Sequence, residues 1–194
     1  MTTKKIKKNK LRVIIYWMNH IWNLRAGYLS NKNWSSICSD STGTKLAACT
    51  DIDSIYTSSD SGVTWTVSSS GSKEWTSICS NSDGSKLAAV ELNIWTNTNY
   101  GAGTWTQQAT SFGTKNWTSI CSNSDGTKLA ACAELNYIYT GTYSGTTWTW
   151  TQQATSLGTK DWKSICSDST GTKLAACVYR EFIYSSSDSG VNWN

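Results

Sequence analysis

Residues 116–151 read NWTSICSNSDGTKLAACAELNYIYTGTYSGTTWTWT, and close variants of this stretch occur three more times in the 194-residue chain. Each copy contains several short apolar runs separated by clusters of Gly, Asn, Asp and Ser, which is the pattern of strands joined by tight turns. No window of the chain carries the apolar spacing of an amphipathic helix. The pattern therefore predicts an all-β fold. The other copies lie at residues 33–66, 74–106 and 161–193.

The period of the repeat indicates which all-β fold to expect. The leading tryptophans are 41, 42 and 45 residues apart. A period of about 40–45 residues is typical of one four-stranded blade of a β-propeller. We therefore expect about four such blades, at residues 33–73, 74–115, 116–160 and 161–194.

The second expected strand of each copy supports stacked sheets. It reads Lys-Leu-Ala-Ala followed by Cys or Val, without the alternation of a sheet that is wet on one face. A strand covered on both faces shows such an unbroken apolar run. The small alanines would let neighbouring sheets approach closely, as blades stacked around an axis must.

The N-terminal part of the repeat region contains a further expected strand. HIWNLRAGYLSNKNW (20–34) aligns without gaps on GTWTQQATSFGTKNW (103–117), so residues 21–27 resemble a fourth strand without the rest of its blade. The last copy stops at Trp193 and Asn194, where its own fourth strand should begin. We expect residues 20–194 to form one propeller domain whose last blade is completed by the N-terminal strand. An open propeller fragment, or one part of an oligomer, is the alternative.

Residues 1–19 are expected to form a basic, poorly ordered segment. Residues 1–30 contain seven bases and no acid, which leaves 10 bases and 13 acids, a net charge of −3, for residues 31–194. A nucleic-acid-binding domain spreads its bases over a folded face, so no nucleic-acid partner is expected. The apolar run VIIYWM is shorter than a signal peptide or a membrane span requires. The sequence therefore predicts no transmembrane helix and does not indicate a compartment.

Two nearly identical octapeptides, SSDSGVTW (58–65) and SSDSGVNW (186–193), carry a family resemblance. They resemble the Asp-box, or bacterial neuraminidase repeat, of sialidases, other glycoside hydrolases, sortilin-type receptor domains and photosystem II assembly factors. The resemblance implies a propeller in which the motif is a structural turn between the third and fourth strands, away from any catalytic face. Its members here are Ser58, Asp60, Gly62, Trp65, Ser186, Asp188, Gly190 and Trp193.

The residues give little support to catalysis. Sialidases hold their substrate with three arginines, whereas this chain has only Arg12, Arg25 and Arg180, two of them in the N-terminal segment. His20 is the only histidine, so a Ser–His or Cys–His mechanism has no plausible base. We assign no catalytic residue and no cofactor. The chain is interpreted as a non-catalytic scaffold or binding module; a carbohydrate-active enzyme or an assembly factor of the photosystem II type is the alternative.

The seven cysteines fit small apolar positions better than a metal site. Three copies carry a C-x10-C pair, and Val90 takes the second position in the remaining copy. There is no CxxC and no histidine beside them, so no metal is expected. Free buried thiols are favoured over cross-hairpin disulfides such as Cys38–Cys49.

The links between the second and third strands, and those between consecutive copies, would meet on one propeller face. Each copy places a lysine and a tryptophan at the start of its first strand and acids in its second link. One interpretation is a surface that binds a protein or a carbohydrate, in a monomer or a small homo-oligomer. The other is that the tryptophans are core and the charges are a solvated rim. The candidates are Lys32, Trp34, Lys73, Trp75, Lys115, Trp117, Lys160, Trp162, Asp51, Glu91, Glu134 and Glu181.

Overall fold

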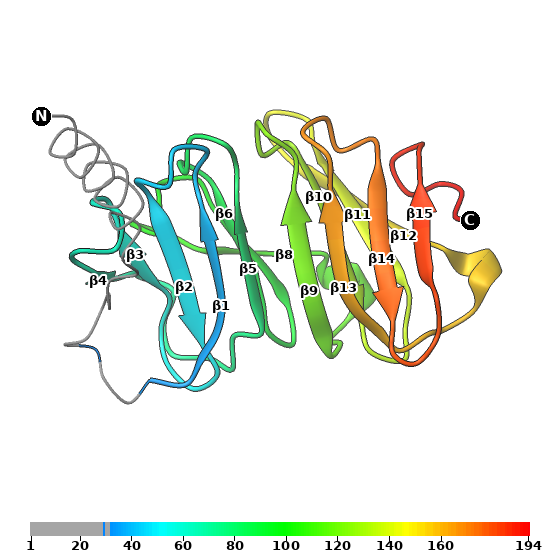
Figure 1. Cartoon of the computed structure of the whole chain (residues 1–194), viewed down its shortest axis with the longest axis horizontal. Helices are drawn as coiled ribbons and strands as arrows, with labels where there is room; N and C mark the ends of the chain where they lie inside the picture. The colour runs from blue at the N-terminus through cyan, green and yellow to red at the C-terminus, as the bar shows by residue number, and fades with distance from the viewer. Residues whose placement is uncertain (1–28, 30–31) are drawn as a thin grey trace, which may run out of the picture.

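The computed structural model describes residue 29 and residues 32–194, which form four antiparallel sheets in a row (Figure 1). The first sheet contains β1 (Trp34–Ser39), β2 (Leu46–Thr50), β3 (Tyr56–Ser58) and β4 (Thr66–Val67). The second contains β5 (Ser77–Ser80), β6 (Leu87–Val90), β7 (Ile94–Asn97) and β8 (Thr106–Gln108). The third contains β9 (Trp117–Ser122), β10 (Lys128–Ala133), β11 (Ile138–Tyr143) and β12 (Trp148–Gln153). The last contains β13 (Trp162–Ser167), β14 (Leu174–Val178) and β15 (Ile183–Ser186).

Each copy of the repeat therefore folds as one meander, in which consecutive strands are hydrogen-bonded neighbours. The first strands of successive sheets lie beside one another, with β1 against β5, β5 against β9, and β9 against β13. Two short 3₁₀ turns, η2 (Thr110–Phe112) and η3 (Thr155–Leu157), begin the links that follow the second and third sheets. No helix in the described part of the chain is long and apolar enough to cross a membrane.

The described sheets form an open row rather than a closed ring. The first and last sheets lie at opposite ends of the molecule in Figure 1. This arrangement confirms the all-β propeller-like fold and matches the open alternative. The described residues give the last sheet three strands, and Asn194 exchanges two backbone hydrogen bonds of 2.9 Å with Ser185 of β15. Residues 21–27, expected to complete it, lie outside the described residues, so that pairing stays a prediction.

The core lies between the sheets. We call the side of a sheet that turns toward the preceding sheet its leading face, and the side that turns toward the following sheet its trailing face. Between the second and third sheets, the trailing residues Val90 and Ile94 pack with the leading residues Trp117, Ile120 and Leu129. All five are at most 5% exposed. The small Ala-Ala positions of the middle strands let these large side chains fill the gap, as the sequence predicted.

The two octapeptides form the same hydrogen-bonded turn. In the first, the backbone N–H and hydroxyl of Thr64 donate to the Asp60 carboxylate at 2.8 and 2.6 Å. The Gly62 N–H donates to the Ser58 hydroxyl at 2.9 Å, with Gly62 at a φ of +82° that other residues rarely adopt. The hydrogen bonds from Thr64 lower the pKa of Asp60 to about 2. The Trp65 indole N–H closes the turn on the Gly62 carbonyl at 3.0 Å.

The two middle copies replace this turn in different ways. In the second copy, the Asn97 side-chain oxygen takes the place of the Ser58 hydroxyl and accepts from Asn99 N–H at 2.9 Å and Gly101 N–H at 2.7 Å. In the third copy, β11 and β12 extend into a hairpin of six paired residues, from Ile138–Gln153 to Tyr143–Trp148. A structural turn tolerates such replacements, because each provides the backbone with partners by other means.

Candidate binding groove

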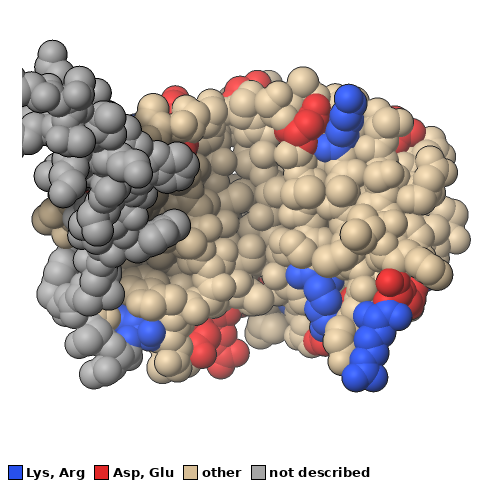
Figure 2. Space-filling view, in the orientation of Figure 1, with Lys and Arg blue, Asp and Glu red and all other residues tan. Residues whose placement is uncertain are grey.

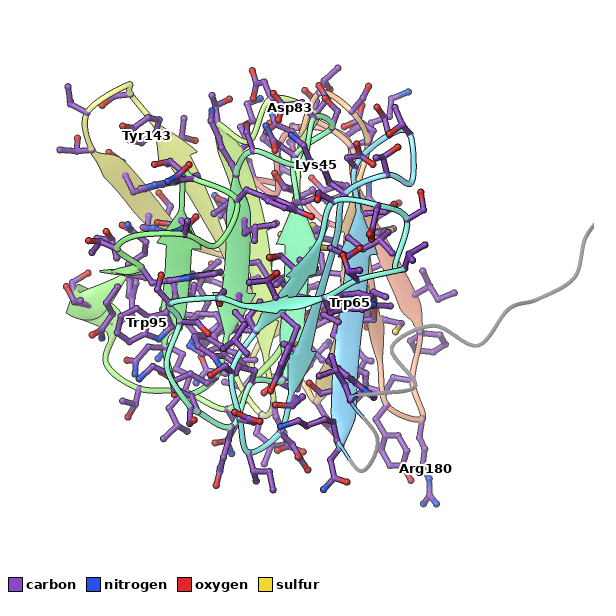
Figure 3. The ribbon with its side chains drawn as sticks, turned by 90° about the vertical axis from the view of Figure 1, so that its left-hand side faces the viewer. Lys45, Trp65, Asp83, Trp95, Tyr143 and Arg180 are labelled. Atoms are coloured by element: carbon purple, nitrogen blue, oxygen red, sulfur yellow. The ribbon has the colours of Figure 1, made fainter. Side chains whose placement is uncertain are left out.

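The links between strands gather at two opposite ends of the sheets. The first-to-second and third-to-fourth strand turns lie at one end, which we call the turn end. The second-to-third links and the links between copies lie at the other, which we call the link end. Figure 3 shows this division, with Asp83 of a first-to-second turn at the top and Arg180 of a second-to-third link at the bottom. In Figure 2 the charged side chains lie mainly along these two edges, and the band between them is formed by other residues.

Backbone hydrogen bonds join the link end from one sheet to the next. Lys73 N–H donates to the Asp53 carbonyl at 3.2 Å, and Lys115 N–H donates to the Leu92 carbonyl at 3.0 Å. Asn136 and Lys160 exchange a pair of such bonds at 3.2 and 3.0 Å. The second-to-third link of each sheet is therefore fixed against the link that enters the next sheet, and the rim of the link end is continuous.

The four predicted lysines contact the sheet rather than solvent alone. Each lysine ammonium lies over an aromatic ring of the third strand of its own sheet, 4.7–5.5 Å from the ring centre. In every copy of the repeat, this aromatic residue directly follows an isoleucine. Lys32 is also paired with Asp53, which raises the pKa of Lys32 to about 12, and Lys160 pairs with Glu181 at 2.7 Å. These positive charges are therefore partly balanced within the fold. The four pairs are Lys32–Tyr56, Lys73–Trp95, Lys115–Tyr139 and Lys160–Tyr184.

Three of the four predicted tryptophans lie in the core. Trp75, Trp117 and Trp162 are at most 2% exposed, whereas Trp34 is 42% exposed. The indole N–H groups of Trp75 and Trp162 donate to the backbone carbonyls of Gly71 and Asn136. The Trp117 indole N–H has no hydrogen-bond acceptor among the described residues. Three of these tryptophans therefore serve mainly as core residues, as the second interpretation of the sequence expected.

The predicted acids of the first three copies meet in one groove at the link end. The groove has a volume of about 470 Å³ and runs across the first, second and third sheets. Asp51, Glu91 and Glu134 line it, together with Glu74, which sequence reasoning did not single out. Within residue 29 and residues 32–194, no lysine or arginine lines the groove, although the Lys163 ammonium lies 3.2 Å from the Glu134 carboxylate. Glu181, in the last copy, is not part of this groove.

Apolar side chains stand beside these carboxylates. Ile52 and Leu92 line the groove and are 69% and 49% exposed. Each follows an acid directly in the sequence, so an acid–apolar pair is repeated in successive second-to-third links. The repeated pair was a signal for this surface, because an isolated acid is ordinary in a turn whereas an exposed aliphatic side chain beside it is not.

The carboxylates of the groove are held in different ways. Glu91 accepts hydrogen bonds from the Asn93 amide at 2.9 Å and from the Trp95 indole at 2.8 Å, which fixes its side chain. Asp51 and Glu74 are exposed. Among the described residues, no three His, Cys, Asp or Glu side chains lie close enough together to hold a metal ion. The groove therefore offers dispersed negative charge and apolar contact along a rim, and its lining also includes Trp75 and Trp117.

Comparison with known proteins supports the fold and leaves the activity open. No protein-family model matches the chain, and no curated protein matches it in sequence. Among solved structures, a putative TolB from Agrobacterium tumefaciens superposes with a TM-score of 0.66 at 14% identity, over 85% of this chain and 62% of that one. The GH74 enzyme of Niastella koreensis gives 0.63 at 18% identity, over 83% and 24%. The GH74 xyloglucanase of Xanthomonas campestris gives 0.58 at 12% identity, over 81% and 29%.

The chain spans less than two thirds of each of these proteins, and of the two GH74 enzymes less than a third. Identities below 20% over such a span indicate a shared arrangement of sheets and carry no shared site. The comparison therefore establishes that the repeat folds as a propeller-like array of sheets.

Proposed function

We propose that this protein is a non-catalytic binding module that recognises a partner through the groove at its link end. The observation that carries the proposal is the convergence of Asp51, Glu74, Glu91 and Glu134 on one groove, to whose lining the described part of the chain adds no basic side chain. A partner segment that alternates positive and apolar side chains would complement both features of this surface. The octapeptide turns, similar to the Asp-box, support the fold at the opposite end and take no part in binding.

The geometry favours binding over hydrolysis. The side chains that line the groove come from links on three different sheets, and a rim built from rigid, mutually bonded links suits recognition of an extended ligand. The carboxylates lie on a continuous backbone rim, so a ligand can contact several of them along its length. The affinity of such a surface should fall with added salt, because exposed charges are screened beyond about 10 Å at 0.1 M salt.

The first experiment measures binding of a fluorescein-labelled peptide of alternating lysine and leucine, with a glutamate–leucine peptide as the charge-reversed control. The test variant is Asp51→Asn/Glu74→Gln, which removes two exposed groove charges and keeps side-chain size. The matched control is Asp83→Asn/Asp125→Asn, which makes the same change in net charge at the turn end and keeps the side-chain oxygens that accept from Ser85 N–H and Thr127 N–H. We expect the groove variant to bind the lysine–leucine peptide with an affinity about threefold to tenfold lower than the parent's. The control should leave the affinity unchanged within about twofold. Equal losses in the two variants, or no binding of the lysine peptide by the parent, would contradict the proposal.

A carbohydrate-active enzyme is the second candidate, favoured by the likeness to GH74 enzymes and by several carboxylates beside Trp75 and Trp117. A glycosidase needs two carboxylates on opposite sides of the bond that it cleaves. Incubation with xyloglucan, followed by measurement of reducing ends and of retention on a xyloglucan column, separates the candidates. If the parent cleaves xyloglucan and Glu91→Gln or Glu134→Gln abolishes the cleavage, the enzyme function would replace the proposal of a binding module. Retention without cleavage would make the ligand a carbohydrate.

A further inference from the structure

The two end sheets expose the faces that every inner sheet buries. Ile78, Ile120 and Ile165 occupy one repeat position on the leading faces, and each is 4% exposed because the preceding sheet covers it. Ile37 occupies the same position in the first sheet and is 63% exposed. The leading face of the first sheet therefore carries the contact residue of an interface whose other half is absent from the described residues.

The trailing face of the last sheet likewise exposes an apolar residue whose counterparts are buried. Ile55, Ile94 and Ile138 hold one repeat position on the trailing faces, and each is at most 1% exposed. Ile183 holds this position in the last sheet and is 77% exposed. Cys166 is exposed as well, whereas its counterparts on the inner sheets are buried or half-buried. The trailing face of the last sheet thus presents the pattern that inner sheets offer to a leading face.

Hydrogen bonds across the inner interfaces repeat with the same regularity. The N–H of the leading-face isoleucine donates to a first-strand serine of the preceding sheet at 3.2–3.3 Å in all three interfaces. The serines are Ser36, Ser77 and Ser119. Ser164 holds this position in the last sheet and is exposed.

A second bond repeats at the turn end, where Ser41, Ser82 and Ser124 each donate a backbone N–H to the carbonyl of the next serine in the series at 2.8–2.9 Å. The final acceptor in that series is the carbonyl of Ser169. If another sheet followed the last one, the Ser169 N–H would donate to the carbonyl of the corresponding serine in that sheet. If another sheet preceded the first one, the Ser41 carbonyl would accept a hydrogen bond from the corresponding N–H of that sheet. Apolar contacts and hydrogen bonds thus match between the two ends of the row.

We propose that a second copy of this chain docks head to tail, with the leading face of its first sheet against the trailing face of the last sheet. The contact repeats the three inner interfaces: Ile37 packs near Ile183 and Cys166, Ile37 N–H donates to the Ser164 hydroxyl, and Ser169 N–H donates to the Ser41 carbonyl. The two faces lie at opposite ends of the row in Figure 1 and are different surfaces, so the contact is heterologous. Two copies joined twice would place about eight sheets around one axis, within the range known for propellers.

Analytical ultracentrifugation of the full chain, from micromolar to millimolar protein, tests the proposal. We expect the parent to reach twice its 21.3 kDa mass. Ile37→Asp and Ile183→Asp should each raise the dissociation constant by about 10- to 100-fold, because each places a carboxylate in an apolar contact. Leu135→Asp changes a residue of similar exposure, 72%, at the link end and should leave the dissociation constant unchanged.

A mixture of the two single variants identifies the direction of docking. Ile37→Asp keeps an intact trailing face and Ile183→Asp keeps an intact leading face, so a one-to-one mixture should regain a dimer through one undamaged contact. Circular dichroism on each variant checks that it is folded. A parent that stays monomeric throughout the range, dimers that neither aspartate weakens, or a mixture that regains no dimer would each overturn head-to-tail docking. These measurements do not depend on the groove, because the residues changed lie outside it.

Discussion

Replacement of Trp162 by alanine tests whether the tryptophan that begins the first strand of each copy stabilises the contact between two sheets. Trp162 is fully buried, packs edge-on against Tyr184 with ring centres 5.5 Å apart, and donates its indole N–H to the Asn136 carbonyl at 3.1 Å. A buried tryptophan removes about 200 Å² from water, worth about 5 kcal/mol at about 25 cal/mol per Å². Measured losses for such truncations are about 3–5 kcal/mol. We expect Trp162→Ala to lower the free energy of unfolding by this amount.

Trp34→Ala is the matched variant, because Trp34 holds the same repeat position in a sheet that no described sheet precedes. Its side chain is 42% exposed, so about three fifths of the area is buried and the expected loss is about 2–3 kcal/mol. Urea unfolding followed by circular dichroism, at low protein concentration, measures both values and avoids the lost tryptophan fluorescence. Equal losses within about 0.5 kcal/mol would refute the reasoning that position in the row decides the contribution. A loss below about 1 kcal/mol for Trp162→Ala would refute the packing itself.

Three further predictions concern the turns, one hairpin and the thiols. Because hydrogen bonds from Thr64 lower the pKa of Asp60 to about 2, its stabilising effect is complete above the unfolded pKa of about 4 and is lost as pH falls toward 2. Thermal unfolding between those pH values should therefore depend less on pH in Asp60→Asn than in the parent, and an unchanged pH dependence would contradict the role of this turn. Gly141→Ala should destabilise the protein by about 1–3 kcal/mol in urea unfolding, since a Cβ there would meet the Trp150 ring at 2.6 Å; Gly145→Ala, where a Cβ would meet nothing within 4 Å, should cost only the backbone strain of about 1 kcal/mol. Burial raises the pKa of the Cys132 thiol to about 12, so at a protein concentration that keeps the chain monomeric a thiol reagent should label the exposed Cys166 in the folded protein and Cys132 only after unfolding, as mass spectrometry of tryptic peptides can show.

The arrangement of sheets could be predicted from the sequence because the repeat copies the same interface. The Leu-Ala-Ala run indicated a strand covered on both faces, and Leu129, Ala130 and Ala131 are all at most 5% exposed. The Asp60 and Asp188 turns were also recognisable, since their hydrogen bonds are local. Local patterns of this kind are determined within a few residues and are visible in one copy.

The third copy departs from the expected turn for a reason that its sequence contains. Tyr143 replaces the aspartate of the turn, and the following TWTWTQQ alternates as a two-faced strand does. The structure accordingly continues β11 to Tyr143 and begins β12 at Trp148, and Gly141 makes room for the Trp150 ring. The alternation therefore predicts the observed hairpin better than Gly145 and Trp148, the two residues that the third copy shares with the octapeptide turn, predict that turn.

The candidate site was harder to predict, because it depends on contacts between links that are distant in sequence. The lysines were expected to share a surface with the acids, and Lys160 does pair with the predicted acid Glu181, while Lys32 pairs with Asp53. The sequence did not indicate that each lysine would also lie over a ring of its own sheet. A cation–π contact at about 5 Å depends on where a long side chain turns back, which spacing does not determine. Glu74 was not predicted as a site residue, because the other copies have Asn or Asp at that position and the repeat therefore shows no consistent acid there.

The two ends of the sheets differ in how much the fold depends on their side chains. At the turn end, serine carbonyls and N–H groups link each sheet to the next, and Asp60, Asp188 and Asn97 satisfy turn amides. Substitutions that remove these accepting or donating atoms disturb bonds on which the fold depends. At the link end, the backbone rim is fixed by its own bonds, so the side chains that it presents can change without loss of those bonds. The second-to-third links accordingly vary from copy to copy, from Asp-Ile and Glu-Leu to Tyr-Arg-Glu-Phe. A binding surface needs this freedom, and this is a physical reason to place the partner at the link end rather than at the conserved-looking octapeptides.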